Sequence, residues 1–175
     1  MNDKVILVDE NDNEVGGINK LEAHQKGLLH RAFSIFIFNS KNELLLQKRS
    51  IQKYHSEGLW SNSCCSHPKP GESLLDATTR RLHEELDLHC SLNFAFSFKY
   101  KIKFINGLTE NELDHVFIGQ TDDTPKINKM EIDDWKYAKC EHILSDMETN
   151  PDDYTEWFKI CIQKLQGHLM KPYLN

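Results

Sequence analysis

Residues 60–72 read W-S-N-S-C-C-S-H-P-K-P-G-E, and residues 73–88 continue as S-L-L-D-A-T-T-R-R-L-H-E-E-L-D-L. Two adjacent thiols and an imidazole therefore stand immediately before a Pro-Gly turn. After this turn the pattern becomes helical, because Leu75, Leu82 and Leu86 are spaced for one buried stripe. The stretch predicts a chemically reactive loop that leads directly into a charged helix.

The charges on this predicted helix have an ordinary and a functional interpretation. Glu72 is expected in the first turn, where a carboxylate suits the positive end of the helix dipole. Arg81 and Glu85 lie four residues apart and therefore on one face. An exposed pair of this kind usually contributes only about 0.3–0.5 kcal/mol. Arg before Glu is the poorer order for helix support, however, and the reactive loop leads straight into the pair, which favours a functional role.

Six residues match the Nudix box, a loop-helix signature that binds divalent metal and diphosphate: Glu72, Arg80, Leu82, Glu84, Glu85 and Leu88. Three positions depart from the box. Ser66 stands where it begins with Gly, Arg81 where it has the first Glu of its R-E pair, and Asp87 where it has the later Gly. That Glu belongs to the metal-binding set of Nudix hydrolases, so its replacement argues against hydrolysis of a diphosphate.

The same departures fit a second family. C-C-S-H-P together with R-R-x-x-x-E is similar to the type I isopentenyl-diphosphate isomerases, which resemble Nudix enzymes in fold but move a double bond instead of hydrolysing. Matching pieces recur in order along nearly the whole chain: L-E-A-H, L-H-R-A-F-S, S-N-S-C-C-S-H-P, F-K-Y-K, E-N-E and T-E-W-F. The resemblance implies an α/β (α+β) fold, with a mixed sheet sandwiched between helices. It also implies a single domain over residues 1–175 with an extra N-terminal hairpin.

The composition fits one globular domain. The 175 residues are 39% hydrophobic and 27% charged, which is enough to bury a core. A net charge of −6 with scattered Lys and Arg argues against a nucleic-acid partner. No segment approaches the roughly 20 apolar residues of a membrane span. The five cysteines are odd in number and include a neighbouring pair, so we expect a reducing, cytoplasmic location. We also expect a monomer or weak dimer that binds a small molecule.

Periodicity predicts the elements around the reactive loop. The clearest is a strand at residues 94–104, where every even position is apolar, followed by a hairpin turn at Asn106-Gly107. The other expected elements are a hairpin from residues 5–8 and 14–18, a helix at 20–26 ended by Gly27, buried strands at 31–38 and 43–49, a strand around 135–138, and a final helix opened by residues 149–151 and buried through Tyr154, Trp157, Phe158, Cys161, Ile162 and Leu165.

Five residues are candidate ligands of one metal, although spacing alone is weak evidence for the histidines. His24 and His30 are six residues apart, which is not a recognised metal spacing. Glu110 and Glu112 are two apart on a predicted strand, so they stand about 7 Å apart on one face and repel each other unless something positive lies between them. The resemblance implies that all four bind one metal together with His67. Mixed imidazole and carboxylate ligands suit Zn²⁺, Mn²⁺ or Fe²⁺ better than Mg²⁺.

Lys48, Arg49 and Lys53 bunch at the end of a predicted strand. Such a cluster is usually a solvated edge, but a diphosphate also needs several cations to offset its desolvation. The resemblance favours a diphosphate site formed by Lys20, Arg49, Lys53 and Arg81. Glu85, with diphosphate oxygens and water, would suit Mg²⁺.

The resemblance also implies the chemistry. Isopentenyl diphosphate would gain a proton at C4 and lose one at C2, giving dimethylallyl diphosphate. The proton arrives on one face and leaves from the other, and the family uses a cysteine and a glutamate for this, here Cys65 and Glu112. In the family, Tyr100 reaches the active site and Trp157 lines a hydrocarbon pocket, which must keep water from a carbocation. Cys64 is interpreted as structural, and a small buried hydrophobe is also the ordinary interpretation of Cys65.

Three functions compete for this constellation. A Nudix hydrolase would release phosphate or a monophosphate, but Arg81 in place of Glu argues against it. A catalytically silent metal- or diphosphate-binding module would leave the presence of both Cys65 and Glu112 unexplained. The isomerase accounts for Arg81, Cys65 and Glu112 together and is the favoured interpretation.

Overall fold

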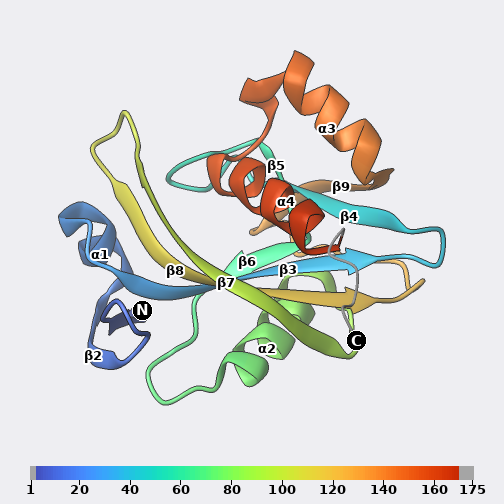
Figure 1. Ribbon diagram of the computed structural model, residues 1–175. Helices are drawn as coiled ribbons and strands as arrows, with labels where there is room; N and C mark the ends of the chain where they lie inside the picture. The colour runs from blue at the N-terminus through green and yellow to red at the C-terminus, as the bar shows by residue number, and fades with distance from the viewer. Residues whose placement is uncertain (1–2, 170–175) are drawn as a thin grey trace.

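A computed structural model describes residues 3–169 of the chain, and a mixed nine-stranded sheet lies between two helical layers (Figure 1). The strands are β1 (Lys4–Val8), β2 (Glu14–Asn19), β3 (His30–Phe38), β4 (Glu43–Arg49), β5 (Trp60–Ser61), β6 (Cys64–Ser66), β7 (Leu92–Lys103), β8 (Thr109–Gln120) and β9 (Ile132–Lys139). The helices are α1 (Lys20–Lys26), α2 (Leu74–Leu86), α3 (Cys140–Thr149) and α4 (Glu156–Leu169), with a 3-10 turn at Pro151–Asp153. This arrangement confirms the predicted fold class and the N-terminal hairpin, β1 with β2.

Strand β3 is the centre of the sheet. It pairs in parallel with β8 and antiparallel with β1, β4 and β6. Ile35, Phe36 and Ile37 are fully buried, as are Leu44 and Leu45 on β4, because both faces of these strands are covered. The predicted buried strands are therefore confirmed.

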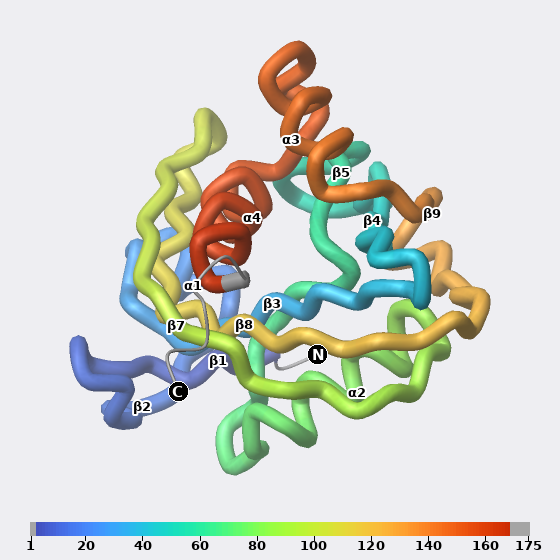
Figure 2. Tube along the Cα trace, turned by 45° about the vertical axis from the view of Figure 1, so that its right-hand side comes forward, coloured from blue at the N-terminus to red at the C-terminus, as the bar shows by residue number. Residues whose placement is uncertain are grey.

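Helix α4 lies on one face of the sheet and α2 on the other (Figure 2), and each face carries its own core. On one face, Phe36 packs with Trp157, Phe158 and Ile162 of α4. On the other face, β3 and β4 pack against α2, which contributes Leu82 among its buried residues. This division matters for function because neighbouring residues of one strand point into different cores.

Helix α2 differs from the prediction at its first turn. It begins at Leu74, and the Ser73 hydroxyl caps it by accepting from the Asp76 amide at 3.1 Å. Glu72 therefore lies before the cap and not in the first turn. Leu75 is 55% exposed, so the prediction that it belongs to the buried stripe was wrong. Leu74 packs against the core in its place.

Strand β7 keeps strict alternation only from Phe96 onward. A register shift between Phe94 and Phe96 turns Phe94 to the opposite side, where it is 57% exposed and contacts Phe117 and His115. The prediction that all even positions share one face was therefore wrong at Phe94, because a bulge inserts one residue into the period of two.

The C-terminal region contains one more helix than predicted. Helix α3 ends at Thr149, the 3-10 turn follows, and α4 begins only at Glu156. Tyr154 is buried but precedes α4, where its hydroxyl donates to Asp146 Oδ2 at 2.5 Å. Within residues 3–169, no helix has both the length and the apolar character needed to cross a membrane.

Candidate functional site

Nine of the predicted site residues line one cavity of about 50 Å³, here called the inner cavity: Lys20, His24, Arg49, Cys65, His67, Tyr100, Glu110, Glu112 and Trp157. Three more line a second cavity, also of about 50 Å³, here called the cationic cavity: Lys53, Arg81 and Glu85. The cavities share Lys20, Arg49, Cys65 and Ser66. The thirteenth predicted residue, His30, is fully buried and contacts Glu112. The fold therefore brings the predicted residues of distant segments into one region.

Strand pairing and capping place the metal-ligand candidates. The parallel register of β3 and β8 sets His30 directly opposite Glu112. His24 lies on α1, which ends at Gly27 with a φ of 61°, a left-handed conformation that suits glycine. His67 follows β6, which pairs with β3 on its other side. Four separate segments, namely α1, β3, the segment after β6, and β8, thus bring these candidates together.

The histidines converge on one carboxylate oxygen. The Nε2 atoms of His24, His30 and His67 lie 3.9, 3.3 and 3.0 Å from Glu112 Oε1. The ligand atoms of these four residues all lie within 4.8 Å of one another. All four side chains are buried or nearly so, which is the arrangement that three nitrogens and one oxygen would need to bind a single ion.

The hydrogen bonds of the rings fit a metal in this position. His30 Nδ1–H donates to the Leu28 carbonyl at 2.8 Å, which leaves Nε2 of the neutral ring without a proton. His24 Nδ1 lies 3.1 Å from the Tyr54 hydroxyl. The buried Nε2 atoms of both rings have no hydrogen-bond partner. Burial lowers the pKa of His24, and that of His67 to about 3, so these rings are neutral and able to bind a cation.

Tyr100 links the two predicted carboxylates. Its hydroxyl donates to Glu112 Oε2 at 2.5 Å and lies 3.2 Å from Glu110 Oε2. Burial and the charge of Glu112 raise the pKa of Glu110 well above its usual range. Burial would also raise the pKa of Glu112, but His67 and the other imidazoles hold it well below its usual range. The two neighbouring carboxyls therefore differ in charge.

Glu110 stands apart from the four-residue group and faces a histidine that the sequence did not reveal. His55 Nε2 lies 3.5 Å from Glu110 Oε1, and the His55 ring stacks on Phe104 at 4.9 Å between centroids. His55 also meets the edge of Trp157, and it lines the inner cavity. A single histidine in an irregular loop has no periodicity or spacing that would have marked it.

The two adjacent cysteines point in opposite directions from β6. Cys64 is fully buried in the core against α2, whereas Cys65 lines the inner cavity. Burial raises the pKa of the Cys65 thiol to about 12, even though the Arg49 guanidinium opposes this shift. The thiol is therefore protonated at neutral pH.

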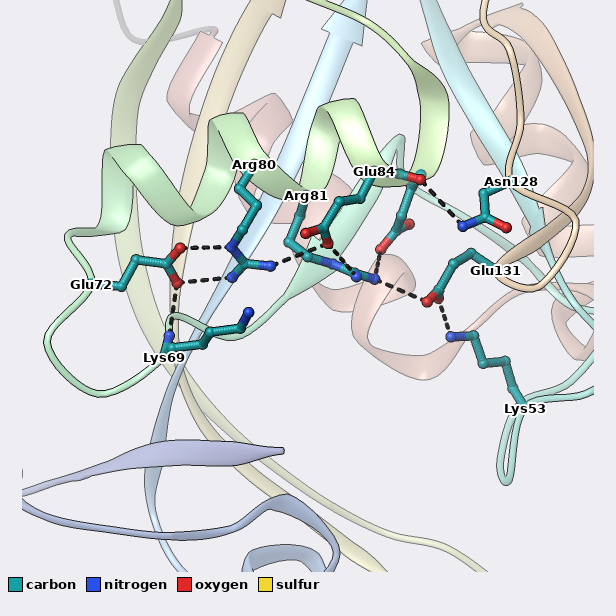
Figure 3. A network of polar contacts seen from close by, with 9 residues as sticks. Lys53, Lys69, Glu72, Arg80, Arg81, Glu84, Asn128 and Glu131 are labelled. Carbon is teal, nitrogen blue, oxygen red and sulfur yellow. Dashed lines mark hydrogen bonds and ion pairs between the residues drawn. The ribbon is translucent and has the colours of Figure 1, made fainter. Parts of the chain in front are cut away.

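The cationic cavity contains two carboxylates, Glu85 and Glu131, among its cations, and Figure 3 shows the contacts of Glu131 with Arg81 and Lys53. Arg81 Nη2 donates to Glu85 Oε1 and lies 3.4 Å from Glu131 Oε1. Lys53 donates to the other oxygen of Glu131. Burial would raise the pKa of Glu131, but the Lys53 hydrogen bond and the Arg81 charge lower it. Glu131 was not among the predicted residues, because an isolated acid in an acidic segment carries no signal of its own.

Trp157 lines the inner cavity next to Arg49, which borders both cavities. Its indole Nε1–H donates to Ser61 Oγ at 3.0 Å, which fixes the ring. The Arg49 guanidinium lies 5.0 Å from the ring centroid, within cation–π range. The buried Arg49 Nε has no hydrogen-bond partner, so this cation retains an unused donor.

Comparison with known proteins identifies close relatives. A NUDIX domain model matches residues 28–158. The chain is 51% identical over 165 residues to Isopentenyl-diphosphate Delta-isomerase 2 of Aromatoleum aromaticum, which covers 94% of this chain and 87% of that protein. It is 49% identical over 165 residues to Isopentenyl-diphosphate Delta-isomerase of Pectobacterium atrosepticum, covering 94% and 92% of the two chains.

Solved structures of more distant proteins share the fold. DR0079 from Deinococcus radiodurans superposes with a TM-score of 0.77 at 20% identity, over 92% of this chain and 98% of that chain. A MutT protein from Methanosarcina mazei gives a TM-score of 0.68 at 19% identity, over 82% and 96%. At these identities the likeness concerns the fold alone.

Proposed function

The chain belongs to the isopentenyl-diphosphate Delta-isomerase family within the NUDIX superfamily, and we propose that Cys65 and Glu112 are its two acid/base groups. The observation that carries this proposal is their placement. Both line the inner cavity, yet they come from β6 and β8, which flank β3 on its two sides. A substrate between them would meet a thiol on one side and a carboxylate on the other.

The proposed reaction moves one double bond and conserves both phosphates. A proton adds to C4 of isopentenyl diphosphate, and a proton leaves C2, so that dimethylallyl diphosphate forms. An alkene is a weak base, so the site must stabilise positive charge on the hydrocarbon. The faces of Trp157 and Tyr100, together with the charge of Glu112, suit this task. Because the reaction is reversible, Cys65 and Glu112 each act as acid in one direction and base in the other.

We propose that His24, His30, His67, Glu112 and Glu110 hold one Zn²⁺ or Mn²⁺ ion. The convergence of three Nε2 atoms on Glu112 Oε1 supports this assignment for the four closest residues, and the Nε2 atoms of His24 and His30 have no hydrogen-bond partner. Glu110 is tied to them through Tyr100. Such an ion would supply Lewis acidity to the carboxylate and imidazoles that hold it.

The diphosphate would lie in the cationic cavity. Lys20, Arg49, Lys53 and Arg81 all line it, and Arg49 also borders the inner cavity. Glu85 would hold Mg²⁺ together with diphosphate oxygens. This places the hydrocarbon against Trp157 and the charged end among the cations.

We further propose that the protein works in the cytoplasm as a monomer or weak dimer. All five cysteines are unpaired, and the mechanism needs Cys65 as a free thiol. A reducing compartment maintains that state.

The proposed roles can be tested by proton NMR, following the rate of dimethylallyl diphosphate formation from isopentenyl diphosphate and Mg²⁺. Cys65→Ser and Glu112→Gln should each lower the rate by about 100-fold or more, the usual contribution of acid/base catalysis. Cys64→Ala is the matched control, because its thiol faces α2, and its rate per folded molecule should match the wild type. A Cys65→Ser rate close to that of the control would refute the assignment.

A further inference from the structure

We propose that Glu131 is the second carboxylate of the Mg²⁺–diphosphate site and makes that site selective for the metal-bound anion over the free anion. This inference rests on the diphosphate site proposed above. It adds a residue that comes from a different segment than α2 and from outside every motif in the sequence.

The position of Glu131 relative to Glu85 is the first observation. Arg81 Nη2 contacts Glu85 Oε1, and it also lies 3.4 Å from Glu131 Oε1 (Figure 3). A single cationic nitrogen therefore lies between two carboxylate oxygens. Mg²⁺ in phosphate-binding sites is typically held by one or two carboxylates together with phosphate oxygens, so the paired acids have the composition that this ion needs.

The rigid placement of Glu131 is the second observation. Its amide donates to the Asn128 carbonyl at 2.9 Å, and its own carbonyl accepts from the Ser50 amide at 3.0 Å. The Asn128 amide in turn donates to the Glu85 carbonyl at 2.9 Å. The backbone of the Glu131 turn is thus tied directly to the backbone of Glu85. The two carboxylates are held on facing segments before any ligand arrives.

Charge explains why this arrangement would be selective. The cationic cavity has four basic residues and two acids. A free diphosphate would be repelled by Glu85 and Glu131, and it would compete with Glu131 for Lys53 and Arg81. With Mg²⁺ present, the same carboxylates become ligands and the repulsion turns into attraction. Glu131 should therefore weaken binding of the free anion and strengthen binding of the metal complex.

Isothermal titration calorimetry with inorganic pyrophosphate tests this inference without turnover. The protein is first loaded with one equivalent of Zn²⁺, so that added Mg²⁺ does not meet an empty histidine site. Pyrophosphate affinity is then measured in magnesium-free buffer and in excess Mg²⁺. In Glu131→Gln, affinity for the magnesium complex should fall while affinity for free pyrophosphate stays the same or rises. The ratio of the two affinities should fall by about 10-fold or more, as for other residues that support a metal site.

Two variants keep the result interpretable. Asp134→Asn is the matched control, because Asp134 is an exposed acid three residues away that lines neither cavity; its ratio should equal that of the wild type. Glu131→Asp keeps the charge on a shorter side chain. It should retain more of the selectivity for the magnesium complex over free pyrophosphate than Glu131→Gln.

An equal loss of both affinities in Glu131→Gln, or an unchanged ratio, would overturn the role of Glu131 and leave the diphosphate site standing. If the wild type bound pyrophosphate in neither buffer, the diphosphate site itself would be wrong, and this inference would fail with it.

Discussion

Glu112 receives contacts from four side chains at once. Its Oε1 faces the Nε2 atoms of His24, His30 and His67, while Oε2 accepts from Tyr100. A buried carboxylate needs such partners, because burial alone favours the neutral form. The environment therefore keeps Glu112 ionised inside the cavity, where it can stabilise positive charge.

Tyr100 should matter for catalysis through its hydroxyl. Tyr100→Phe removes the 2.5 Å hydrogen bond to Glu112 and leaves the ring in place. A hydrogen bond to a charged group contributes about 1.5–3 kcal/mol, so kcat should fall about 10- to 100-fold. KM for isopentenyl diphosphate should change little, because the hydroxyl does not line the cationic cavity.

Tyr154→Phe is the control for this experiment. The Tyr154 hydroxyl bonds Asp146, away from both cavities, so kcat should stay within about twofold of the wild type. If Tyr100→Phe lost no more activity than this control, the hydroxyl would have no part in the reaction.

At the scale of single residues, the sequence predicted the residues that belong to motifs and missed those that do not. His24 and His30 became candidates only through the family resemblance, since their spacing is uninformative and the parallel register of β3 with β8 is what brings His30 to Glu112. His55 and Glu131 come from irregular segments. Their positions in the cavities depend on which strands and turns meet in space, and a single sequence does not contain that information.

At the scale of elements, the junction between the reactive loop and α2 is held by one carboxylate. Glu72 Oε1 accepts from Arg80 Nε at 2.6 Å, and Oε2 accepts from Arg80 Nη2 at 2.8 Å and from the Lys69 amide at 2.9 Å (Figure 3). The two parallel bonds form a bidentate pair. Glu72 thus ties the loop that carries Cys65 and His67 to the helix that carries Arg81.

Removing this charge should lower stability in a pH-dependent way. The Arg80 hydrogen bond lowers the pKa of Glu72 below its ordinary value of 4.5. The stabilisation is therefore present above about pH 4.5 and is lost as the pH falls through the folded-state pKa. Glu72→Gln should reduce the free energy of unfolding by about 1 kcal/mol at neutral pH, since the pair is partly exposed.

Urea denaturation at neutral pH and near pH 3 measures this difference. The gap between wild type and Glu72→Gln should shrink in acid, because below its ordinary pKa Glu72 takes up a proton more readily in the unfolded chain than beside Arg80. Glu84→Gln, whose carboxylate is more exposed, should lose less at neutral pH. A gap of the same size at both pH values would mean that the ion pair is not its cause.

Most elements were predicted, and the exceptions have local physical reasons. The alternation of β7 was visible, but the bulge that turns Phe94 outward was not, because one inserted residue leaves no mark in composition. Helix α3 was missed: its buried residues are only Ile143 and Met147, too few to give a strong stripe. The first turn of α2 shows that propensity does not fix which of two adjacent leucines, Leu74 or Leu75, meets the core.

At the scale of the whole molecule, the site exists only because the sheet is assembled around β3. Its metal-ligand candidates come from α1, β3, the segment after β6, and β8. The two faces of the sheet contribute residues to different cavities. One face with α4 encloses the inner cavity, and α2 on the other face supplies Arg81 and Glu85 to the cationic cavity. The family resemblance predicted a sheet between helices but not this division, which the packing of the two cores explains.

The most direct test of the whole account follows the wild-type protein with isopentenyl diphosphate and Mg²⁺ in D₂O by proton and phosphorus NMR. We predict dimethylallyl diphosphate that carries deuterium in the methyl group derived from C4, with its diphosphate intact. Release of phosphate or isopentenyl monophosphate, or unchanged substrate with metal-loaded protein, would contradict the account.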